Sequence, residues 1–266
     1  MKRLFFFLPF TVLSCLLHAQ NMSGGAENAG LGGILSYSRN SEALCGNSSG
    51  LTTSRQAQIA VFSEIPFGIM AGMRNRFGIM RPLKTGTGAL TVSRYGNSNF
   101  NINTFSALYA HHIAPVSLGL RFNTHSYNIA GSGSTRKISF DFGGHSQLSE
   151  NLIFGAYISN FTLSRLAGEA SLYIPVIMAT GLHWSPSQFA KVSIELVKEP
   201  GFPGSVRTGL EYGIYESLRL RGGYSSAPGR IHLGFGVSGA AFRISYASVT
   251  HPVLPISHFL SVEYQL

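Results

Sequence analysis

The strongest constraint on the fold is a run of alternating residues that ends the sequence. Within residues 258–266 the apolar positions are Leu260, Val262, Tyr264 and Leu266. Polar residues stand between them, and successive side chains of a strand point to opposite faces. The run therefore predicts a strand with one apolar and one polar face. Similar segments recur from about residue 53, as in outer-membrane β-barrels, whose lipid-facing and lumen-facing residues alternate.

Fourteen strands follow from this alternation and from the turn-forming residues that interrupt it. Eight are expected at residues 56–63, 70–82, 85–95, 101–113, 116–128, 136–147, 151–163 and 171–184. Six more are expected at 188–199, 204–215, 217–226, 229–238, 240–250 and 256–266. About 15 residues are available per strand, enough for a tilted membrane strand and a turn. We predict an all-β fold, a closed antiparallel transmembrane β-barrel of about fourteen strands; twelve also fit the length.

The composition agrees with a membrane barrel. The 266-residue chain contains 31 glycines, 19 phenylalanines and 11 tyrosines, and only 12% of its residues are charged. An ordinary soluble domain carries roughly 25% charged residues. After the N-terminal region, no segment approaches 18 consecutive apolar residues, which argues against a helical membrane protein.

The N-terminal residues predict export. Lys2 and Arg3 precede an apolar run over residues 4–17, and a pattern typical of a cleavage site follows. We assign residues 1–19 to a cleavable signal peptide and expect the bacterial outer membrane as the location. Cleavage would remove two basic residues and no acidic one, so the formal charge would fall from +9 to +7. An uncleaved anchor and a lipoprotein signal at Cys15 are the alternatives.

The residues after the signal do not alternate. We expect residues 20–52 to form an N-terminal hatch or plug, with a turn at 27–34 and a short helix at 40–44, and residues 53–266 to form the barrel. Cys45 is the one cysteine beyond the signal, so an internal disulfide is excluded there.

The N-terminal region resembles a known family. The glycine-rich residues 24–33 and residues 41–51 are similar to the start of FadL-like outer-membrane barrels of Bacteroidetes-type bacteria, including the PorV/PorQ group. Residues 41–51 correspond to the pattern A-L-x-x-N-P-A-G-L, with Ser48 and Ser49 in place of its Pro and Ala. The hatch residues that the resemblance singles out are Gly32, Gly33, Asn47 and Gly50.

A second segment, residues 246–258, resembles the H-P-x-L-G-x-S-H hairpin before the last strand of that family, with Pro255 in place of Gly. Its motif residues are His251, Pro252, Ser257 and His258. The resemblance implies a fourteen-stranded barrel with a hatch, and either uptake of hydrophobic compounds or a non-transporting role in type IX protein secretion or surface anchoring. We favour transport of small or hydrophobic solutes; a secreted soluble β-rich adhesin is a further hypothesis.

Basic residues opposite the apolar faces are the candidates for a role in the lumen. They are Arg121, Arg219, Arg221, Arg230 and Arg243. A charge on the lipid face costs about 2–4 kcal/mol at the bilayer midplane, so these side chains should point inward. There they would form either an anion pathway or a polar network that packs the wall against the hatch. The sequence leaves both roles open.

The expected partners are outer-membrane lipids and lipopolysaccharide, the barrel-assembly machinery and secretion-system proteins. Arg74, Arg76 and Arg81 stand near strand ends, where we expect contacts with lipopolysaccharide phosphates. Nucleic acid is not expected, because the basic residues are spread along alternating strands without a nucleic-acid-binding motif.

Catalytic, metal and cofactor motifs find no support in the sequence. Residues 46–50 match G-x-S-x-G but lack the strand-to-helix context of a nucleophile elbow. His111 and His112 are adjacent, so on a strand they point to opposite faces and do not chelate one ion. Residues 131–135 lack the lysine of a phosphate loop and are expected to form an exposed loop. We predict neither enzymatic activity nor a cofactor.

Overall fold

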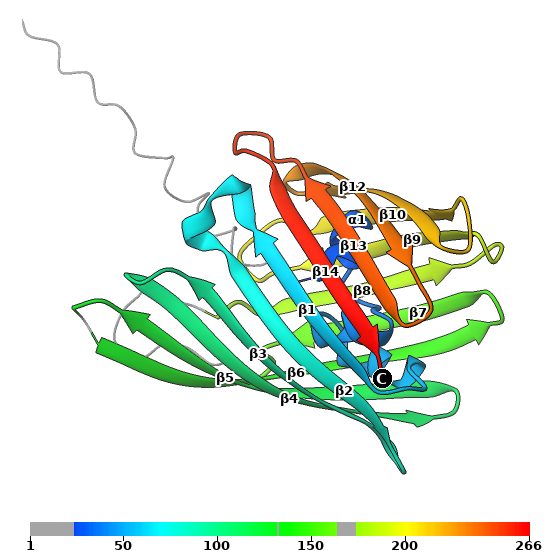
Figure 1. The fold of residues 1–266 in the computed structure, drawn as a ribbon, viewed down its shortest axis with the longest axis horizontal. Helices are drawn as coiled ribbons and strands as arrows, with labels where there is room; N and C mark the ends of the chain where they lie inside the picture. The colour runs from blue at the N-terminus through cyan, green and yellow to red at the C-terminus, as the bar shows by residue number, and fades with distance from the viewer. Residues whose placement is uncertain (1–23, 132, 164–173) are drawn as a thin grey trace, which may run out of the picture.

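The computed structural model describes residues 24–131, 133–163 and 174–266. The predicted signal peptide lies outside the described residues. In the described residues, three short helical segments precede fourteen strands, which close into a barrel (Figure 1), and two 3-10 turns, η4 (Pro66–Gly68) and η5 (Met70–Gly72), lie between the first two strands. The predicted closed, antiparallel, fourteen-stranded β-barrel is confirmed.

The first seven strands are β1 (Gln58–Ile65), β2 (Arg74–Leu83), β3 (Gly86–Gly96), β4 (Phe100–Ile113), β5 (Val116–Ile129), β6 (Gly133–Ser149) and β7 (Leu152–Ser159). The other seven are β8 (Ile177–Trp184), β9 (Ala190–Lys198), β10 (Ser205–Gly213), β11 (Leu218–Ser226), β12 (Gly229–Ser238), β13 (Phe242–Val249) and β14 (Ser257–Gln265). Each strand pairs with its neighbours in the chain, and β1 pairs with β14.

Four predicted boundaries are wrong by three or more residues, among them the end of the strand predicted at 151–163, since β7 ends at Ser159. The second predicted strand began at residue 70, but Met70–Gly72 is a 3-10 turn, η5, and β2 begins at Arg74. The loop expected at residues 131–135 is shorter, because β6 begins at Gly133 and pairs with Ile129 of β5. The eighth predicted strand began at residue 171, but β8 begins at Ile177. The common reason is that pairing with a distant neighbour, rather than local alternation, decides where a strand ends.

The outward face of the barrel is an apolar belt. Every strand contributes at least one large apolar side chain whose exposure exceeds a third, for example Leu233 at 57% and Ile194 at 49%. A surface of this kind around a closed barrel fits the hydrocarbon core of a membrane. Among the described residues, no helix has the length and apolar character needed to cross a membrane.

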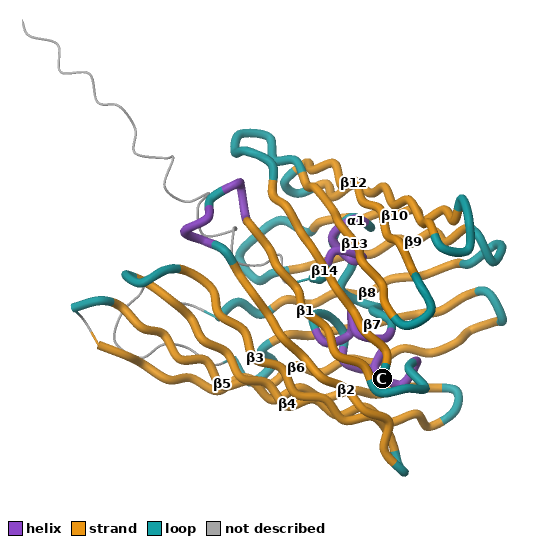
Figure 2. The backbone as a smooth tube through the Cα atoms, in the orientation of Figure 1, coloured by secondary structure: helices purple, strands orange, loops and turns teal. Residues whose placement is uncertain are grey.

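The two ends of the barrel have connections of different length. At one end, which we call the loop end, the connections include residues 66–73, 199–204 and 250–256. At the other, the turn end, they include residues 84–85, 114–115 and 150–151. The C-terminus lies at the turn end (Figure 1). Figure 2 shows the strands wrapped around the helical segments near the N-terminus.

The apolar belt predicts how an outward charge affects stability. Leu233→Arg in the middle of β12 should lower the free energy of unfolding in lipid vesicles by about 2–4 kcal/mol, since the charge would enter hydrocarbon. Val253→Arg, in a loop and 86% exposed, should change it by less than about 0.5 kcal/mol. Urea titration in vesicles measures both. Equal effects would contradict a lipid-facing Leu233.

Candidate functional site

The interior of the barrel is filled by the N-terminal segment, residues 24–54, which we call the hatch. It contains α1 (Ala26–Gly30) and two 3-10 segments, η2 (Asn40–Leu44) and η3 (Ser48–Thr53). The α1 helix packs on the inner faces of β11 to β14, and η3 packs on β3 to β6. The hatch therefore bridges the lumen from one side of the wall to the other.

Glycines on the inner face of the wall make room for the hatch backbone. Their paired positions across neighbouring strands are Gly119 with Gly143, Gly155 with Gly181, and Gly209 with Gly223. A Cβ atom at Gly223 would lie 2.3 Å from the backbone nitrogen of Gly32, and one at Gly119 would lie 2.3 Å from that of Ser49. These contacts are too close for any side chain, so the glycines form the seat of the hatch.

The three predicted hatch glycines also satisfy backbone constraints. Gly32 and Gly33 have φ angles of +83° and +77°, a backbone conformation that residues other than glycine rarely adopt. A Cβ atom at Gly32 would lie 2.5 Å from the carbonyl oxygen of Thr208, and one at Gly50 would lie 1.7 Å from that of Ser38. Gly32 and Gly50 therefore permit a close approach between two backbones, and Gly33 is required by its positive φ.

Asn47 joins the hatch to the wall through its side-chain amide. Its Nδ2 donates to the carbonyl oxygens of Ser36 at 2.6 Å, Gly144 at 3.2 Å and Ala156 at 3.0 Å. Its Oδ1 accepts from the backbone nitrogen of Ser49 at 3.0 Å. The side chain is fully buried, so it satisfies backbone groups of the hatch, β6 and β7 together.

Charged side chains of the wall bind backbone groups of the hatch in the same way. The Glu195 carboxylate accepts from the backbone nitrogens of Leu35 and Ser36 at 2.8 and 2.5 Å. Arg121 donates to the carbonyl oxygens of Ala43 and Gly46 at 3.0 and 2.9 Å. These charge-assisted hydrogen bonds are stronger than neutral ones. The alternation places Glu195 on an inward face, but its contact with the hatch could not be predicted from the sequence.

A network of ion pairs holds the α1 side of the hatch. Arg221 lies 2.7 Å from both Glu27 of α1 and Glu211 of β10. Glu211 also pairs with Lys191 at 2.6 Å and Arg219 at 3.2 Å.

Arg243 extends the same network, since it lies 3.7 Å from Glu27 and 3.6 Å from Glu263. Four of the five candidate arginines, Arg121, Arg219, Arg221 and Arg243, thus have acidic or carbonyl partners in the lumen. Of the two roles left open by the sequence, their arrangement is that of a polar network packed against the hatch.

A cavity, which we call the vestibule, opens toward the loop end. It has about 950 Å³ of empty space, the open mouth included. Arg76 and Arg121 lie at its base, and Tyr95, Tyr127 and Tyr157 are among its lining side chains.

Asp141 orders one wall of the vestibule. Its carboxylate accepts from Tyr157 Oη at 3.3 Å, Asn123 Nδ2 at 3.1 Å and the backbone nitrogen of Asn160 at 2.9 Å. The vestibule therefore combines aromatic rings with positively charged and hydrogen-bonding groups.

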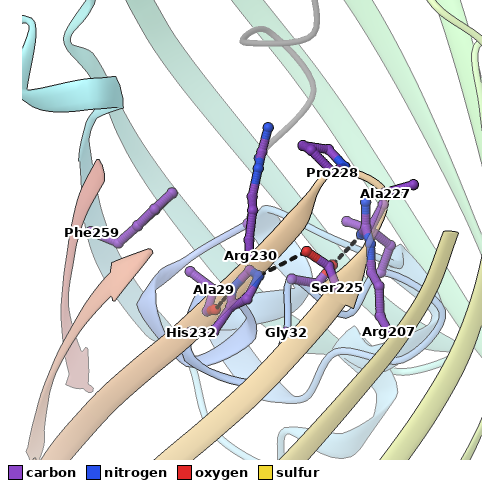
Figure 3. Close-up of a pocket in the computed structure, with 12 residues that line it drawn as sticks. Ala29, Gly32, Arg207, Ser225, Ala227, Pro228, Arg230, His232 and Phe259 are labelled. Carbon is purple, nitrogen blue, oxygen red and sulfur yellow. Dashed lines mark hydrogen bonds between the residues drawn. The ribbon is translucent and has the colours of Figure 1, made fainter. Parts of the chain in front are cut away.

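A smaller recess of about 430 Å³ lies beside Arg230, the fifth candidate arginine (Figure 3). His232 donates from Nδ1 to the carbonyl oxygen of Ala29 at 2.6 Å and lies 3.2 Å from Ser225 Oγ. Arg207 donates to the carbonyl oxygen of Gly33. Hatch residues thus form part of the recess, whose other walls come from β10 to β12 and β14.

A third cavity, of about 590 Å³, lies toward the turn end and is lined by Tyr37, His183 and Lys191. The hatch residues Glu27, Asn28 and Leu31 also line it. The hatch therefore separates space reached from the loop end from space reached from the turn end.

The residues of the final-hairpin motif lie at the loop end of β13 and β14. His251 Nδ1 accepts from the backbone nitrogens of Val253 and Leu254 at 3.2 and 3.1 Å, which fixes the turn after Pro252. Ser257 Oγ accepts from the backbone nitrogen of Phe67 at 2.9 Å.

His258 Nδ1 lies 2.7 Å from Tyr246 Oη. The motif thus fastens two loop-end connections to each other and to the wall.

The predicted contact of Arg74 and Arg76 with lipopolysaccharide is wrong. Both face the lumen, where Arg74 pairs with Glu64 at 2.8 Å and both residues line the vestibule. The outward positions of β2 are held instead by residues such as Phe77 and Ile79. Arg81 does face outward, near the turn end.

The sequence motifs considered for catalysis have structural positions. Ser48, of the G-x-S-x-G pattern, is buried in η3 of the hatch. His112 faces inward, 2.9 Å from Ser117 Oγ, and His111 faces outward beside Tyr109. Within the described ranges, no group of three or more His, Cys, Asp or Glu residues is placed to hold a metal ion.

Comparisons with known proteins show that the chain has the same fold as several solved structures. No protein-family model and no curated protein matches the chain. The Ralstonia pickettii toluene transporter TbuX is similar, with TM-score 0.74 and 10% identity over 93% of this chain and 100% of that chain. The monoaromatic hydrocarbon channel CymD gives TM-score 0.70 and 12% identity, covering 92% and 98% of the two chains.

The P. putida toluene transporter TodX gives TM-score 0.69 and 12% identity, covering 92% of this chain and 99% of that chain. The structure therefore has a FadL-like fold, a fourteen-stranded outer-membrane type of barrel.

Buried Glu42 makes the docking of the hatch sensitive to pH. Its Oε1 accepts from the backbone nitrogen of Glu27 and from Ser261 Oγ, each at 3.2 Å. Burial, Glu27 and Glu263 together raise its pKa to about 8, against the opposing effect of Arg221. The docked hatch therefore favours the protonated form of Glu42.

We expect the seat to be specific for glycine. Gly223→Ala places a methyl group against the hatch backbone, and overpacking of this kind costs about 1–3 kcal/mol. A loss of 1–2 kcal/mol makes the undocked hatch about 5–30 times more populated, which limited proteolysis of the hatch would detect. Gly222→Ala is the control, because its Cβ meets no atom within 4 Å. Equal cleavage of both variants would contradict the seat.

We also expect hatch docking to weaken as pH rises. A carboxyl whose pKa is about 8 when docked and near 4.5 when exposed binds more protons in the docked state between these values. The docking free energy therefore falls as pH rises from about 4.5 through about 8. Protease cleavage of the hatch should accelerate over this range in the wild type, and should accelerate less in Glu42→Gln. A pH dependence of cleavage in Glu42→Gln equal to that of the wild type would show that a group other than Glu42 causes it.

Proposed function

We propose that the protein is an outer-membrane channel that admits small solutes, hydrophobic ones among them, when the hatch moves. One observation carries the proposal: a closed barrel with an apolar outer belt has its lumen interrupted by a segment of the same chain. The hatch is held by packing, hydrogen bonds and ion pairs, and its Cys45 is a free thiol. Its release requires no covalent bond to break.

The shared fold supports a transport role. The three similar structures are described as toluene transporters and a monoaromatic hydrocarbon channel. In the vestibule of this chain, the rings of Tyr95, Tyr127 and Tyr157 offer aromatic surfaces to a solute. We therefore propose small aromatic compounds as one class of solute.

The orientation follows from the connections. Outer-membrane barrels place short turns in the periplasm and longer loops outside the cell. The loop end and the vestibule would therefore face the exterior, with the turn-end cavity beyond the hatch facing the periplasm. A solute would reach the vestibule first and pass on when the hatch is displaced.

The other functional hypotheses have less support. A PorV/PorQ-like role in type IX secretion stays a prediction carried by the resemblance alone. A soluble adhesin would leave the apolar belt exposed to water, which soluble monomers avoid over so large a surface.

Uptake by whole cells tests the proposal. Expression in a Gram-negative host without such a channel should raise the uptake rate of radiolabelled toluene but not that of ribose. Gly223→Ala, which loosens the hatch, should admit ribose as well, and Gly222→Ala should behave as the wild type does. Equal toluene uptake with and without the protein, at matched amounts of heat-modifiable barrel, would refute the channel.

A further inference from the structure

The acidic side chains of the strands are confined to one face of the wall. All strand carboxylates point into the lumen: Glu64, Asp141, Glu195, Glu211 and Glu263. The outward-facing charged side chains of the strands are Arg81, Arg94, Arg136 and Lys198. The outer face of the described wall therefore carries only cations, and all of them stand near strand ends.

Two of these cations belong to one cross-strand row at the loop end. Arg94 of β3 is opposite Asn103 of β4, Asn103 is opposite Ser126 of β5, and Ser126 is opposite Arg136 of β6. Three strand spacings separate the two arginines, roughly 14 Å along the sheet. We call these four residues the basic row.

The basic row marks the edge of the apolar belt. The next row toward the turn end includes Val92, Phe105 and Ile138, each 45–50% exposed. The next row toward the loop end includes Asn101 and Asn128, which are joined by a hydrogen bond of 2.9 Å. Lipid chains and polar headgroups would therefore meet the wall at the height of the basic row.

Both guanidinium groups are available to a ligand. Arg94 and Arg136 are exposed, and within the part of the chain that the structure describes neither guanidinium group has a hydrogen bond or an ion pair. By contrast, the outward-facing Lys198 donates to the carbonyl oxygen of Phe202 at 2.5 Å. Asn103 between the arginines is held by its hydrogen bond to Asn101 at 2.9 Å.

We propose that the basic row binds the phosphorylated headgroup of lipopolysaccharide in the outer leaflet. Each guanidinium can hold a phosphate through two parallel hydrogen bonds. A diphosphorylated disaccharide would lie along the row with one phosphate near each arginine. Its acyl chains would cover the apolar side chains of the row beneath. The inference depends on the outer-membrane location proposed above, but not on transport.

Binding of fluorescent diphosphoryl lipid A to the purified full-length protein in detergent tests the inference. The double variant Arg94→Gln, Arg136→Gln should bind at least about tenfold more weakly, since it loses two charge-assisted contacts. Arg81→Gln, on the same face near the turn end, is the matched control and should bind as the wild type does. With lipid A lacking both phosphates, the wild type and the double variant should bind equally.

Two results would overturn the inference: unchanged affinity in the double variant, or an equal loss in Arg81→Gln, which would indicate unspecific attraction to basic residues. Heat-modifiability on gels verifies that each variant is folded. Toluene uptake by the double variant should equal that of the wild type. If the wild type takes up toluene but does not bind lipid A, only the lipid A inference is refuted. If the wild type does not take up toluene, the proposed channel is refuted.

Discussion

Pairing of β1 with β14 joins the two ends of the sheet, from Gln58 opposite Gln265 to Ile65 opposite His258. In hydrocarbon, an unpaired strand edge would leave backbone N–H and C=O groups without partners, and each such group costs several kcal/mol. Closure removes that cost and at the same time creates an inside and an outside. Most large outward side chains are apolar, and the strand carboxylates all face inward.

The enclosed space sets the next requirement. A segment packed inside the barrel brings its own backbone groups away from water, and these need partners. The wall supplies them from inward-facing side chains: Glu195 accepts from two hatch amides, and Arg121 donates to two hatch carbonyls. Glycines opposite the hatch, such as Gly143 and Gly155, let the two backbones approach closely enough for these bonds.

Alternation revealed the strands because it is a local property with a period of two residues. It gave the strand count and the inward direction of residues such as Arg221. The prediction for Arg74 was wrong: a contact with a lipid headgroup was expected, but Arg74 stands at an inward-facing position of β2. The inward glycines were a signal in the same alternation, since Gly119 and Gly143 occupy lumen-facing positions.

The contacts of the hatch could not be predicted in this way. Which carbonyl meets Arg121, or which amides meet Glu195, depends on the placement of segments that lie 75 to 160 residues apart in sequence. The resemblance did single out Asn47 and the hatch glycines by position, but not the wall groups they meet.

The two sides of the hatch are held by different interactions, and this determines how it can move. Leu44 and Leu51 are buried against Ala60, Met80 and Leu108 of the wall, an apolar contact that weakens gradually with separation. On the α1 side, Arg221 is buried and forms an ion pair with Glu27, whose side chain is 16% exposed.

Moving α1 partway would take Glu27 from Arg221 before it reaches water, while Arg221 would keep Glu211 as its partner at 2.7 Å. We therefore expect intermediate positions of α1 to be less favourable than the docked position or one in which Glu27 reaches water. Since α1 and the two 3-10 segments are joined by a short chain, we expect the proposed movement of the hatch to be concerted, between two states, rather than continuous.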